Sequence, residues 1–387
     1  MRPGTASMIP YGRQEITAAD IAAVTAVLGS DFLTQGPAIP RFEQAIADYC
    51  GAAHGVAVNS ATSALHIACL ALDLGPGDWL WTSPNTFVAS ANCGRYCGAA
   101  VDFVDIDPDT YNLSPKALAA KLEAAAARGR LPKILVPVHF AGLPCDMEAI
   151  AALGQRYGFR IIEDASHAIG GRYRGEAIGN CRYSDITVFS FHPVKIITTG
   201  EGGLATTNDP ALAEHMARLR SHGITRDPAG MRGEPEGPWY YQQLELGFNY
   251  RITDIQAALG HSQLQRLDDY VARRQRLAAR YDRDLAALPL RLPYRDPAHQ
   301  SALHLYPIQV RGDRGRVFAA LRRAGIGVNV HYIPVHTQPD YARFGFRRGD
   351  FPQAEAYYEH AISLPLFPTM TEAEQDRVMA ALAAALT

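Results

Sequence analysis

Lys195 is the side chain of this sequence best placed for covalent chemistry. It ends the apolar run of "DITVFSFHPVKIITTGEGG" and stands just before a glycine-rich turn. The sequence contains only four lysines. Two of the others, Lys116 and Lys121, lie five residues apart in "SPKALAAKLEAAAARGR", where solvated charge on a helix surface is expected, and Lys133 merely opens the run "KILVPVH". Lys195 is therefore the amine that we expect to reach into a cleft.

Asp164 is the acid that we expect to meet a ligand. It follows the apolar residues of "RIIEDA" and is expected at the carboxyl end of that strand. Open α/β sheets bind their ligands at this edge. An aspartate that only caps the next turn with its side chain is the alternative, and Asp164 taken alone does not separate the two.

A third motif, "NSATSAL", places small hydroxyl residues where the strand "GVAVN" turns into a helix. Ser60, Thr62 and Ser63, with the free backbone amides of that turn, would make an anion site suited to a phosphate, although such residues often only cap a helix. Pyridoxal phosphate needs all three motifs: a lysine for the Schiff base, an acid for the ring nitrogen, and hydroxyls and amides for the phosphate. The sequence therefore predicts this cofactor.

The elements that must position these residues follow from the hydrophobic pattern. Short apolar runs alternate with helical patterns from "GVAVN" to "FRIIEDA", which predicts an α/β fold with a mostly parallel sheet. The runs "DITVFSF" and "GGLATTN" follow each other without a helix, so we expect a hairpin and one antiparallel strand. The stretch "RDPAGMRGEPEGPWYY" is typical of a long surface loop. We expect a flexible extension over 1–8, a large domain over 9–252 and a smaller domain over 253–387.

Composition excludes several classes of protein. With 387 residues, 48% of them hydrophobic, the chain can bury a sizeable core, and its formal net charge of -2 provides no basic field for nucleic acid. No segment approaches the roughly 20 apolar residues of a membrane span, and the N-terminus lacks the apolar stretch of a secretory signal. We therefore expect a cytoplasmic protein. Six scattered cysteines favour neither disulfides nor a metal site; Cys93 and Cys97 lie one helical turn apart, but core packing is the better explanation.

These motifs stand in the order seen in a known family. The chain resembles the DegT-type sugar aminotransferases over nearly everything from Ile9 to the C-terminus. The resemblance rests on "FLTQGPAIPRFEQAIADYCG", "VNSATSALHIA", "SPNTFVASAN", "VPVHFAG", "EDASHAIGG", "FSFHPVKIITTGEGG", "RSHGI", "GFNYRITDIQAALG" and "VHYIPVH". It implies the aspartate aminotransferase-like fold, fold type I, with a mixed, mostly parallel central sheet and a smaller C-terminal α+β domain.

The resemblance also implies a role for individual residues. Lys195 would hold the cofactor and shuttle a proton, and Asp164 would bind the ring nitrogen. Phe87 would stack on the ring, where helix core is the alternative, and His167 would lie near the cofactor's other side or its hydroxyl, where a structural histidine is the alternative. The residues implied for the phosphate site are Thr62, Ser63, Ser190 and Asn249 from the other subunit of a homodimer, where a turn residue is the alternative for Asn249. Two further residues would face the sugar, His331 and His336, where a packed strand end is the alternative.

A transamination follows from the same resemblance. Some family members carry histidine in place of the lysine and dehydrate their substrate, so Lys195 disfavours that reaction here. L-glutamate is the implied amino donor and a nucleotide-linked keto sugar the acceptor, most specifically a UDP-linked 4-keto-6-deoxy-N-acetyl sugar aminated at carbon 4 for pseudaminic acid. Amination of another such sugar, at carbon 3 or 4, is the alternative. The absence of G-x-G-x-x-G after the first strand argues against a nicotinamide enzyme, and intact Lys195 and Asp164 argue against a non-catalytic sugar-binding homologue.

Overall fold

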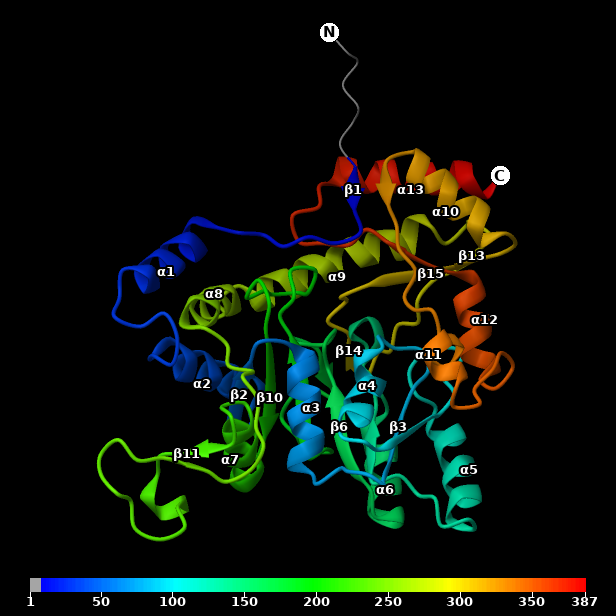
Figure 1. Cartoon of the computed structure of the whole chain (residues 1–387). Coiled ribbons are helices and arrows are strands. Elements are labelled where there is room, and N and C mark those ends of the chain that lie inside the picture. The colour runs from blue at the N-terminus through cyan, green and yellow to red at the C-terminus, as the bar shows by residue number, and fades with distance from the viewer. Residues whose placement is uncertain (1–7) are drawn as a thin grey trace.

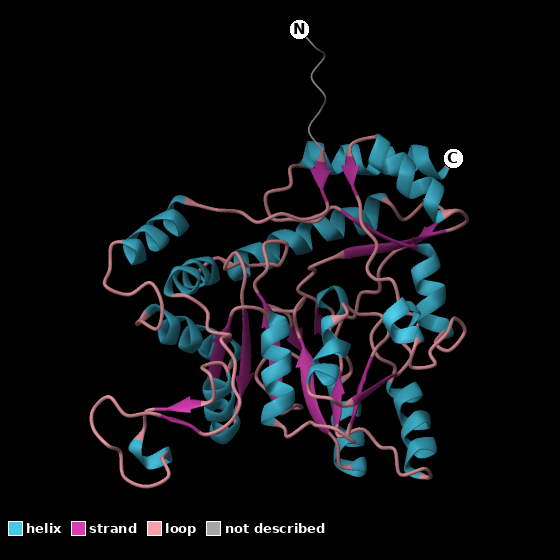
Figure 2. Cartoon of the chain, viewed as in Figure 1, coloured by secondary structure: helices cyan, strands magenta, loops and turns pink. Residues whose placement is uncertain are grey.

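The computed structural model describes residues 8–387 of the chain (Figure 1). Of the extension predicted over 1–8, residues 1–7 lie outside the described part, and the side chain of Met8 is exposed. Helices pack around a central group of strands, and a long loop connects two short strands at one corner of the molecule (Figure 2). No helix within residues 8–387 is both long enough and apolar enough to cross a membrane.

A seven-stranded sheet forms the centre of the larger part, in the order β2-β10-β9-β6-β5-β3-β4. Its strands are β2 (His54–Val58), β3 (Trp79–Thr82), β4 (Ala100–Phe103), β5 (Ile134–Val136), β6 (Arg160–Asp164), β9 (Ile186–Ser190) and β10 (Gly203–Thr207). The strands from β9 to β4 pair in parallel, whereas β10 is antiparallel to both neighbours, β2 and β9. The predictions of a mixed, mostly parallel sheet and of an antiparallel strand at "GGLATTN" are confirmed.

Helices lie on both faces of this sheet, which explains why every residue of β9 and β10 is buried. They are α2 (Ala38–Cys50), α3 (Ala61–Ala71), α4 (Ala89–Tyr96), α5 (Pro115–Ala126), α6 (Met147–Tyr157), α7 (Pro210–Leu219) and α8 (Asp254–Leu264), whereas α1 (Ala18–Leu28) packs on α8. Short side chains begin several of them: Ser60, Ser114 and Asp209 each accept a hydrogen bond from a backbone N–H of the first turn. Such caps satisfy donors that the helix itself leaves without a partner.

A smaller α+β part follows in the chain. Its antiparallel sheet consists of β13 (Leu290–Arg291), β15 (Tyr306–Val310) and β17 (Ala361–Leu364). Its helices are α9 (Leu267–Asp284), α10 (Arg314–Arg323), α11 (Pro339–Ala342), α12 (Pro352–His360) and α13 (Glu372–Leu386). The first strand of the described residues also lies here, because β1 (Ile9–Pro10) pairs in parallel with β16 (Ile326–Gly327) beside α13 (Figure 1).

The remaining elements are short. They are β7 (Arg172–Tyr173), β8 (Glu176–Ala177), β14 (His299–Gln300), β11 (Ile224–Thr225), β12 (Gln242–Gln243) and three 3-10 turns, Phe140–Gly142, Pro228–Gly230 and Val335–Thr337. The strands β11 and β12 close the base of the long surface loop that the sequence predicts, and this loop projects from the corner of the molecule (Figure 1).

Packing bears on the boundary predicted at residue 252. The first half of α9 packs with α8 and the large sheet's core through Leu267 and Val271, whereas Leu277 and Tyr281 pack in the core of the C-terminal part. Ile9 packs in that second core as well. We therefore propose that the division between the two parts runs through α9, with β1 crossing to the smaller part.

Candidate active site

Asp164 is the last residue of β6 and lies at the carboxyl edge of the sheet. Its side chain is 5% exposed. The Oδ2 atom accepts a hydrogen bond from Ser90 Oγ at 2.6 Å, and Oδ1 accepts one from the Ser166 N–H at 3.0 Å. Because each oxygen has its own donor, the carboxylate is held in one direction.

Ser90 is a residue of this site that the sequence analysis did not single out. It lies in the first turn of α4, is fully buried, and has Thr86 Oγ1 at 2.7 Å from its Oγ. An ionised carboxylate only accepts hydrogen bonds, so the Ser90 proton goes to Asp164 and Thr86 donates to Ser90. The signal available in the sequence was a pair of hydroxyl residues, four apart, beside a helix start.

Lys195 lies in the loop 191–202 between β9 and β10, where its N–H donates to the His192 carbonyl at 2.9 Å. Its side chain is half-buried. Burial lowers the pKa of the Lys195 amine to about 8, although the negative charge of Asp164 acts in the opposite direction. The structure thus brings Lys195 and Asp164 within electrostatic range, and Lys195 can be neutral at a pH where an exposed lysine is charged.

The pH dependence of Lys195 provides a direct test of this environment. Only the neutral amine reacts with an acylating reagent. In cofactor-free protein the labelling rate of Lys195 should therefore increase with pH, with a midpoint near pH 8. In Asp164→Asn the charge that raises the pKa of Lys195 is absent, and the midpoint should fall below that of the parent. Mass spectrometry of the Lys195 peptide measures both rates. A midpoint of the parent at the ordinary lysine value, about 10.4, would contradict the burial of this amine.

The start of α3 provides free donors for an anion. Ser60 caps the helix by accepting from the Ser63 N–H at 3.1 Å, and Ser63 Oγ donates to Asn59 Oδ1 at 2.6 Å. Both donors of Ser63 are therefore already used within the chain. The N–H groups of Ala61 and Thr62 and the Thr62 hydroxyl have no acceptor within residues 8–387. Thr62 is thus better placed than Ser63 to bind a phosphate, together with these amides.

Ser190 and Gly203 complete this end of the site. Ser190 is the last residue of β9 and pairs with Gly203 at the start of β10. A Cβ at Gly203 would lie 2.4 Å from the Ala61 nitrogen, so only glycine allows this strand to approach the start of α3 so closely. Ser190, whose hydroxyl has no hydrogen bond within the described part of the chain, therefore pairs with the strand residue that approaches the free amides.

The aromatic side of the site includes His167, Phe87 and Tyr332. His167 is 5% exposed; its Nδ1 accepts from the Ala141 N–H at 3.3 Å, and its Nε2 lies 3.0 Å from Tyr332 Oη. Phe87 is 58% exposed, and its ring centroid is 6.2 Å from that of Tyr332. The alternative of Phe87 as helix core is therefore wrong, and an exposed ring is available for stacking.

The two histidines of "HYIPVH" lie in different environments. His331 is near the site: burial, followed by the positive charge of Lys195, lowers its pKa to about 3, and its Nδ1 is 2.8 Å from Ser363 Oγ. His336 is fully buried, packs against the Phe351 ring at 4.8 Å, and has its Nε2 at 2.9 Å from Glu355 Oε1. Because a fully buried side chain offers no surface to a ligand, we leave His336 out of the site.

Asn249 lies in a segment that runs beside the end of β2. It forms an isolated antiparallel bridge with Ser221, and the following Tyr250 carbonyl accepts from the Asn59 N–H at 2.8 Å. Its side chain is exposed and makes no hydrogen bond within residues 8–387. The amide is therefore available to a partner subunit, as its expected role requires.

Comparison with known proteins identifies the group to which this arrangement belongs. A model of the DegT/DnrJ/EryC1/StrS aminotransferase family matches residues 14–383. The chain is 41% identical over 382 residues to the spore coat polysaccharide biosynthesis protein SpsC of Bacillus subtilis (strain 168), which covers 97% of this chain and 96% of that protein. The chain belongs to this aminotransferase family.

Solved structures agree with this assignment to the DegT/DnrJ/EryC1/StrS family. The PMP-form of Spr1654 from Streptococcus pneumoniae, described as a sugar aminotransferase, is 30% identical with a TM-score of 0.89 over 98% of this chain and 99% of that chain. Helicobacter pylori PseC, an aminotransferase of pseudoaminic acid biosynthesis, is 29% identical with a TM-score of 0.90 and the same coverage. The fold is the predicted fold type I, and the chain is a pyridoxal phosphate-dependent sugar aminotransferase.

The residues of this family member fit pyridoxal phosphate, which is also the cofactor of the PLP-form of Spr1654. Free donors at Ala61, Thr62 and Ser190 suit its phosphate, and the close approach at Gly203 shapes that cradle. Asp164 presents a fixed carboxylate for the ring nitrogen, and Lys195 an amine that loses its proton easily. Thus the chemistry of the available groups agrees with the cofactor of the family.

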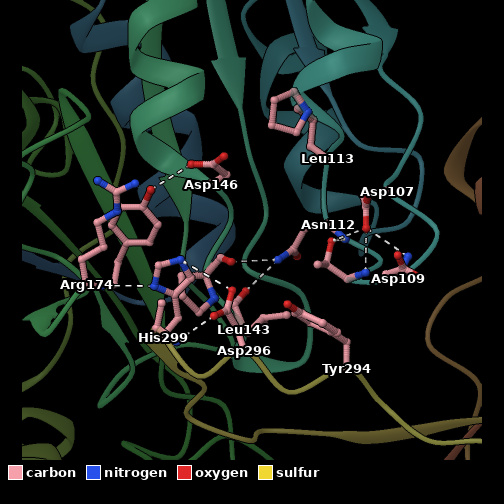
Figure 3. A pocket seen from close by; sticks show the side chains of 15 residues that line it. Asp107, Asp109, Asn112, Leu113, Leu143, Asp146, Arg174, Tyr294, Asp296 and His299 are labelled. Carbon is pink, nitrogen blue, oxygen red and sulfur yellow. Dashed lines mark hydrogen bonds and ion pairs between the residues drawn. The ribbon is translucent and has the colours of Figure 1, made fainter.

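A cavity of about 440 Å³ lies apart from these residues in the same protein (Figure 3). It is lined by the loop after β4, the loop before α6 and the segment before β14, and neither Lys195 nor Asp164 lines it. Its polar groups bond one another: Tyr173 Oη donates to Asp146 Oδ1 at 2.9 Å, and the Arg174 N–H donates to His299 Nδ1 at 3.2 Å. Without a free buried donor or acceptor in its wall, we do not assign it to the active site.

Proposed function

We propose that this aminotransferase moves the amino group of L-glutamate to carbon 4 of a UDP-linked 4-keto-6-deoxy-N-acetyl sugar and so forms UDP-4-amino-4,6-dideoxy-N-acetyl-beta-L-altrosamine. One observation carries the chemistry: a half-buried Lys195 with a lowered pKa stands within electrostatic range of Asp164 at the carboxyl edge of the sheet. Donor and acceptor would use this site in turn, which predicts ping-pong kinetics.

Each residue has a defined task in the proposed transfer. Bound pyridoxal phosphate supplies an electron sink for the pair released when the substrate carbon loses its proton. Lys195 Nζ takes that proton as a general base and returns it as a general acid, for which a pKa near the working pH is suited. Asp164, which is held by Ser90 and the Ser166 N–H, would bind the ring nitrogen with a carboxylate of fixed orientation. Thr62, Ser190 and the free amides of α3 bind the phosphate group.

The choice of sugar is supported by the similarity to PseC at 29% identity together with the motifs "NSATSALHIA", "FSFHPVKIITTGEGG" and "VHYIPVH". The higher identity to SpsC, 41%, favours a second candidate, the amination of another nucleotide-linked keto sugar at carbon 3 or 4 for a surface polysaccharide. Both candidates share the residues that bind the cofactor, because loops select the sugar.

We also propose a homodimer with shared active sites. Asn249 is exposed with its amide free, and large apolar side chains are exposed on and after α1: Ile21, Leu28, Phe32 and Leu33. Exposed apolar groups of this size on neighbouring segments are typical of a protein interface. Asn249→Ala should then weaken cofactor binding in the dimer. The cytoplasmic location of the protein stays a prediction.

Absorption spectroscopy tests both halves of the transfer. The band of the lysine-bound cofactor should bleach when L-glutamate is added and return when the UDP-linked 4-keto-6-deoxy-N-acetyl sugar follows. The keto sugar added without glutamate is the control and should leave the band unchanged. A band that bleaches and returns only with a different nucleotide-linked keto sugar supports the second candidate. A band that glutamate leaves intact contradicts the proposed donor.

A further inference from the structure

Tyr332 lies on the aromatic side of the active site, beside His167 and Phe87. Its Oη lies 3.0 Å from His167 Nε2, and the two rings stack with centroids 6.0 Å apart at an angle of 22°. His304 packs on His167 as well, at a centroid distance of 4.4 Å. The Tyr332 side chain is half-buried, next to the exposed ring of Phe87. It is therefore fixed by neighbours and still accessible to a ligand.

The protons of this pair follow from the hydrogen bonds. The Ala141 N–H can only donate, so His167 Nδ1 must present a lone pair to it. Burial, followed by the positive charge of Lys195, holds the pKa of His167 well below its usual range. The neutral ring then carries its one proton on Nε2 and donates it to Tyr332 Oη.

Tyr332 is consequently left with a free proton. Its oxygen accepts from His167, and its own O–H has no acceptor within residues 8–387. His167, in contrast, has both ring nitrogens engaged. A role for His167 in which a ring nitrogen meets the cofactor hydroxyl would require one of these bonds to break.

We infer that the Tyr332 phenol, positioned by His167, donates a hydrogen bond to the ring oxygen of the bound cofactor. The elimination is chemical: Asp164 suits the ring nitrogen, the start of α3 suits the phosphate, and the ring oxygen is the acceptor that remains. Tyr332 also lies within electrostatic range of Asp164, whose charge adds to burial in raising the pKa of Tyr332. The phenol therefore stays protonated and can donate.

This inference rests on the cofactor and not on the proposed sugar, so it stands whichever sugar is aminated. A donor at the ring oxygen stabilises the deprotonated, more electron-rich form of the lysine-bound cofactor. In Tyr332→Phe the pH midpoint of the absorption change should therefore move upward by about one pH unit, which is a tenfold change in the equilibrium. The measurement is a pH titration of the visible spectrum of the cofactor-loaded protein without substrate.

Tyr357→Phe is the matched control. Tyr357 is buried close by, but its hydroxyl donates to the His331 carbonyl at 3.0 Å, so its removal should leave the midpoint unchanged. His167→Leu removes the bond that positions Tyr332 and should shift the midpoint in the same direction as Tyr332→Phe. The double variant should shift it no further than Tyr332→Phe alone. An unchanged midpoint in Tyr332→Phe overturns the inference, and so does an unchanged midpoint in His167→Leu if Tyr332→Phe does not fold.

Discussion

Lys195→Ala is expected to lower kcat by about a hundred- to ten-thousandfold while the protein keeps its fold and still binds pyridoxal phosphate. General acid-base catalysis by one side chain contributes about 10²- to 10⁴-fold, and Lys195 is the amine whose pKa the charge of Asp164 affects. The half-buried amine makes no side-chain hydrogen bond within residues 8–387, so its removal should cost little stability. Steady-state kinetics, with circular dichroism for the fold, measure both effects.

Two further measurements separate chemistry from structure in this variant. Lys133→Ala is the control: its Nζ bonds Asp78 at 2.9 Å on the surface, and the loss of such a pair costs about 0–1 kcal/mol and should leave kcat unchanged. A small primary amine added to Lys195→Ala should restore part of the activity, because it can move the proton that Nζ moves. Activity of Lys195→Ala at the parent level would exclude Lys195 as the catalytic base.

Much of the fold follows from local sequence. Apolar runs bounded by turn residues predict β2, β3, β5 and β6, and the absence of a helix between "DITVFSF" and "GGLATTN" predicts the antiparallel β10. Asp164 and Lys195 can be predicted from the sequence for the same reason, since each follows an apolar run. A strand end at the ligand-binding edge is a local property of the chain.

Contacts between distant segments are not encoded in such local patterns. Ile9 pairs with Ile326, and α9 packs in two cores; neither follows from periodicity within a window of the sequence. His336 faces Glu355 and Phe351 instead of the site because of how the turn Val335–Thr337 packs against α12. Hydrophobic pattern and spacing contain no information about that packing partner.

The dependence on distant contacts also explains why local sequence patterns do not identify Ser90 and Tyr332 as site residues. Ser90 becomes meaningful only when α4 places its Oγ 2.6 Å from Asp164, which lies 74 positions away in the chain. In the sequence, Tyr332 lies between His331 and His336, whose titratable side chains are the obvious candidates for a site. The role of Tyr332 depends on its contact with the Nε2 atom of His167. Both residues act through hydrogen bonds to a distant segment, and that is a property of the tertiary structure.

Asp164→Asn is expected to lower kcat by about a hundredfold, with a free energy of unfolding close to that of the parent. A charged hydrogen bond contributes about 1.5–3 kcal/mol, which corresponds to roughly a ten- to hundredfold change in rate, and the variant would lack the charge that Asp164 offers to the ring nitrogen. Asparagine has nearly the same shape, and its side-chain oxygen can still accept from Ser90 or from the Ser166 N–H. Steady-state kinetics and the spectrum of the loaded protein measure the first effect, and urea unfolding measures the second.

The neighbouring Glu163 provides a matched control for this prediction, because successive residues of β6 face opposite sides of the sheet. Glu163 accepts from Thr187 Oγ1 at 3.2 Å and has His139 Nε2 at 2.7 Å from its other oxygen, away from Ser90. Glu163→Gln should therefore lower the free energy of unfolding by about 1–3 kcal/mol and leave the cofactor spectrum unchanged, which is the reverse of Asp164→Asn. If both variants lost stability and both kept the parent spectrum, Asp164 would be a structural residue, and the assignment of the ring-nitrogen partner would have to be abandoned.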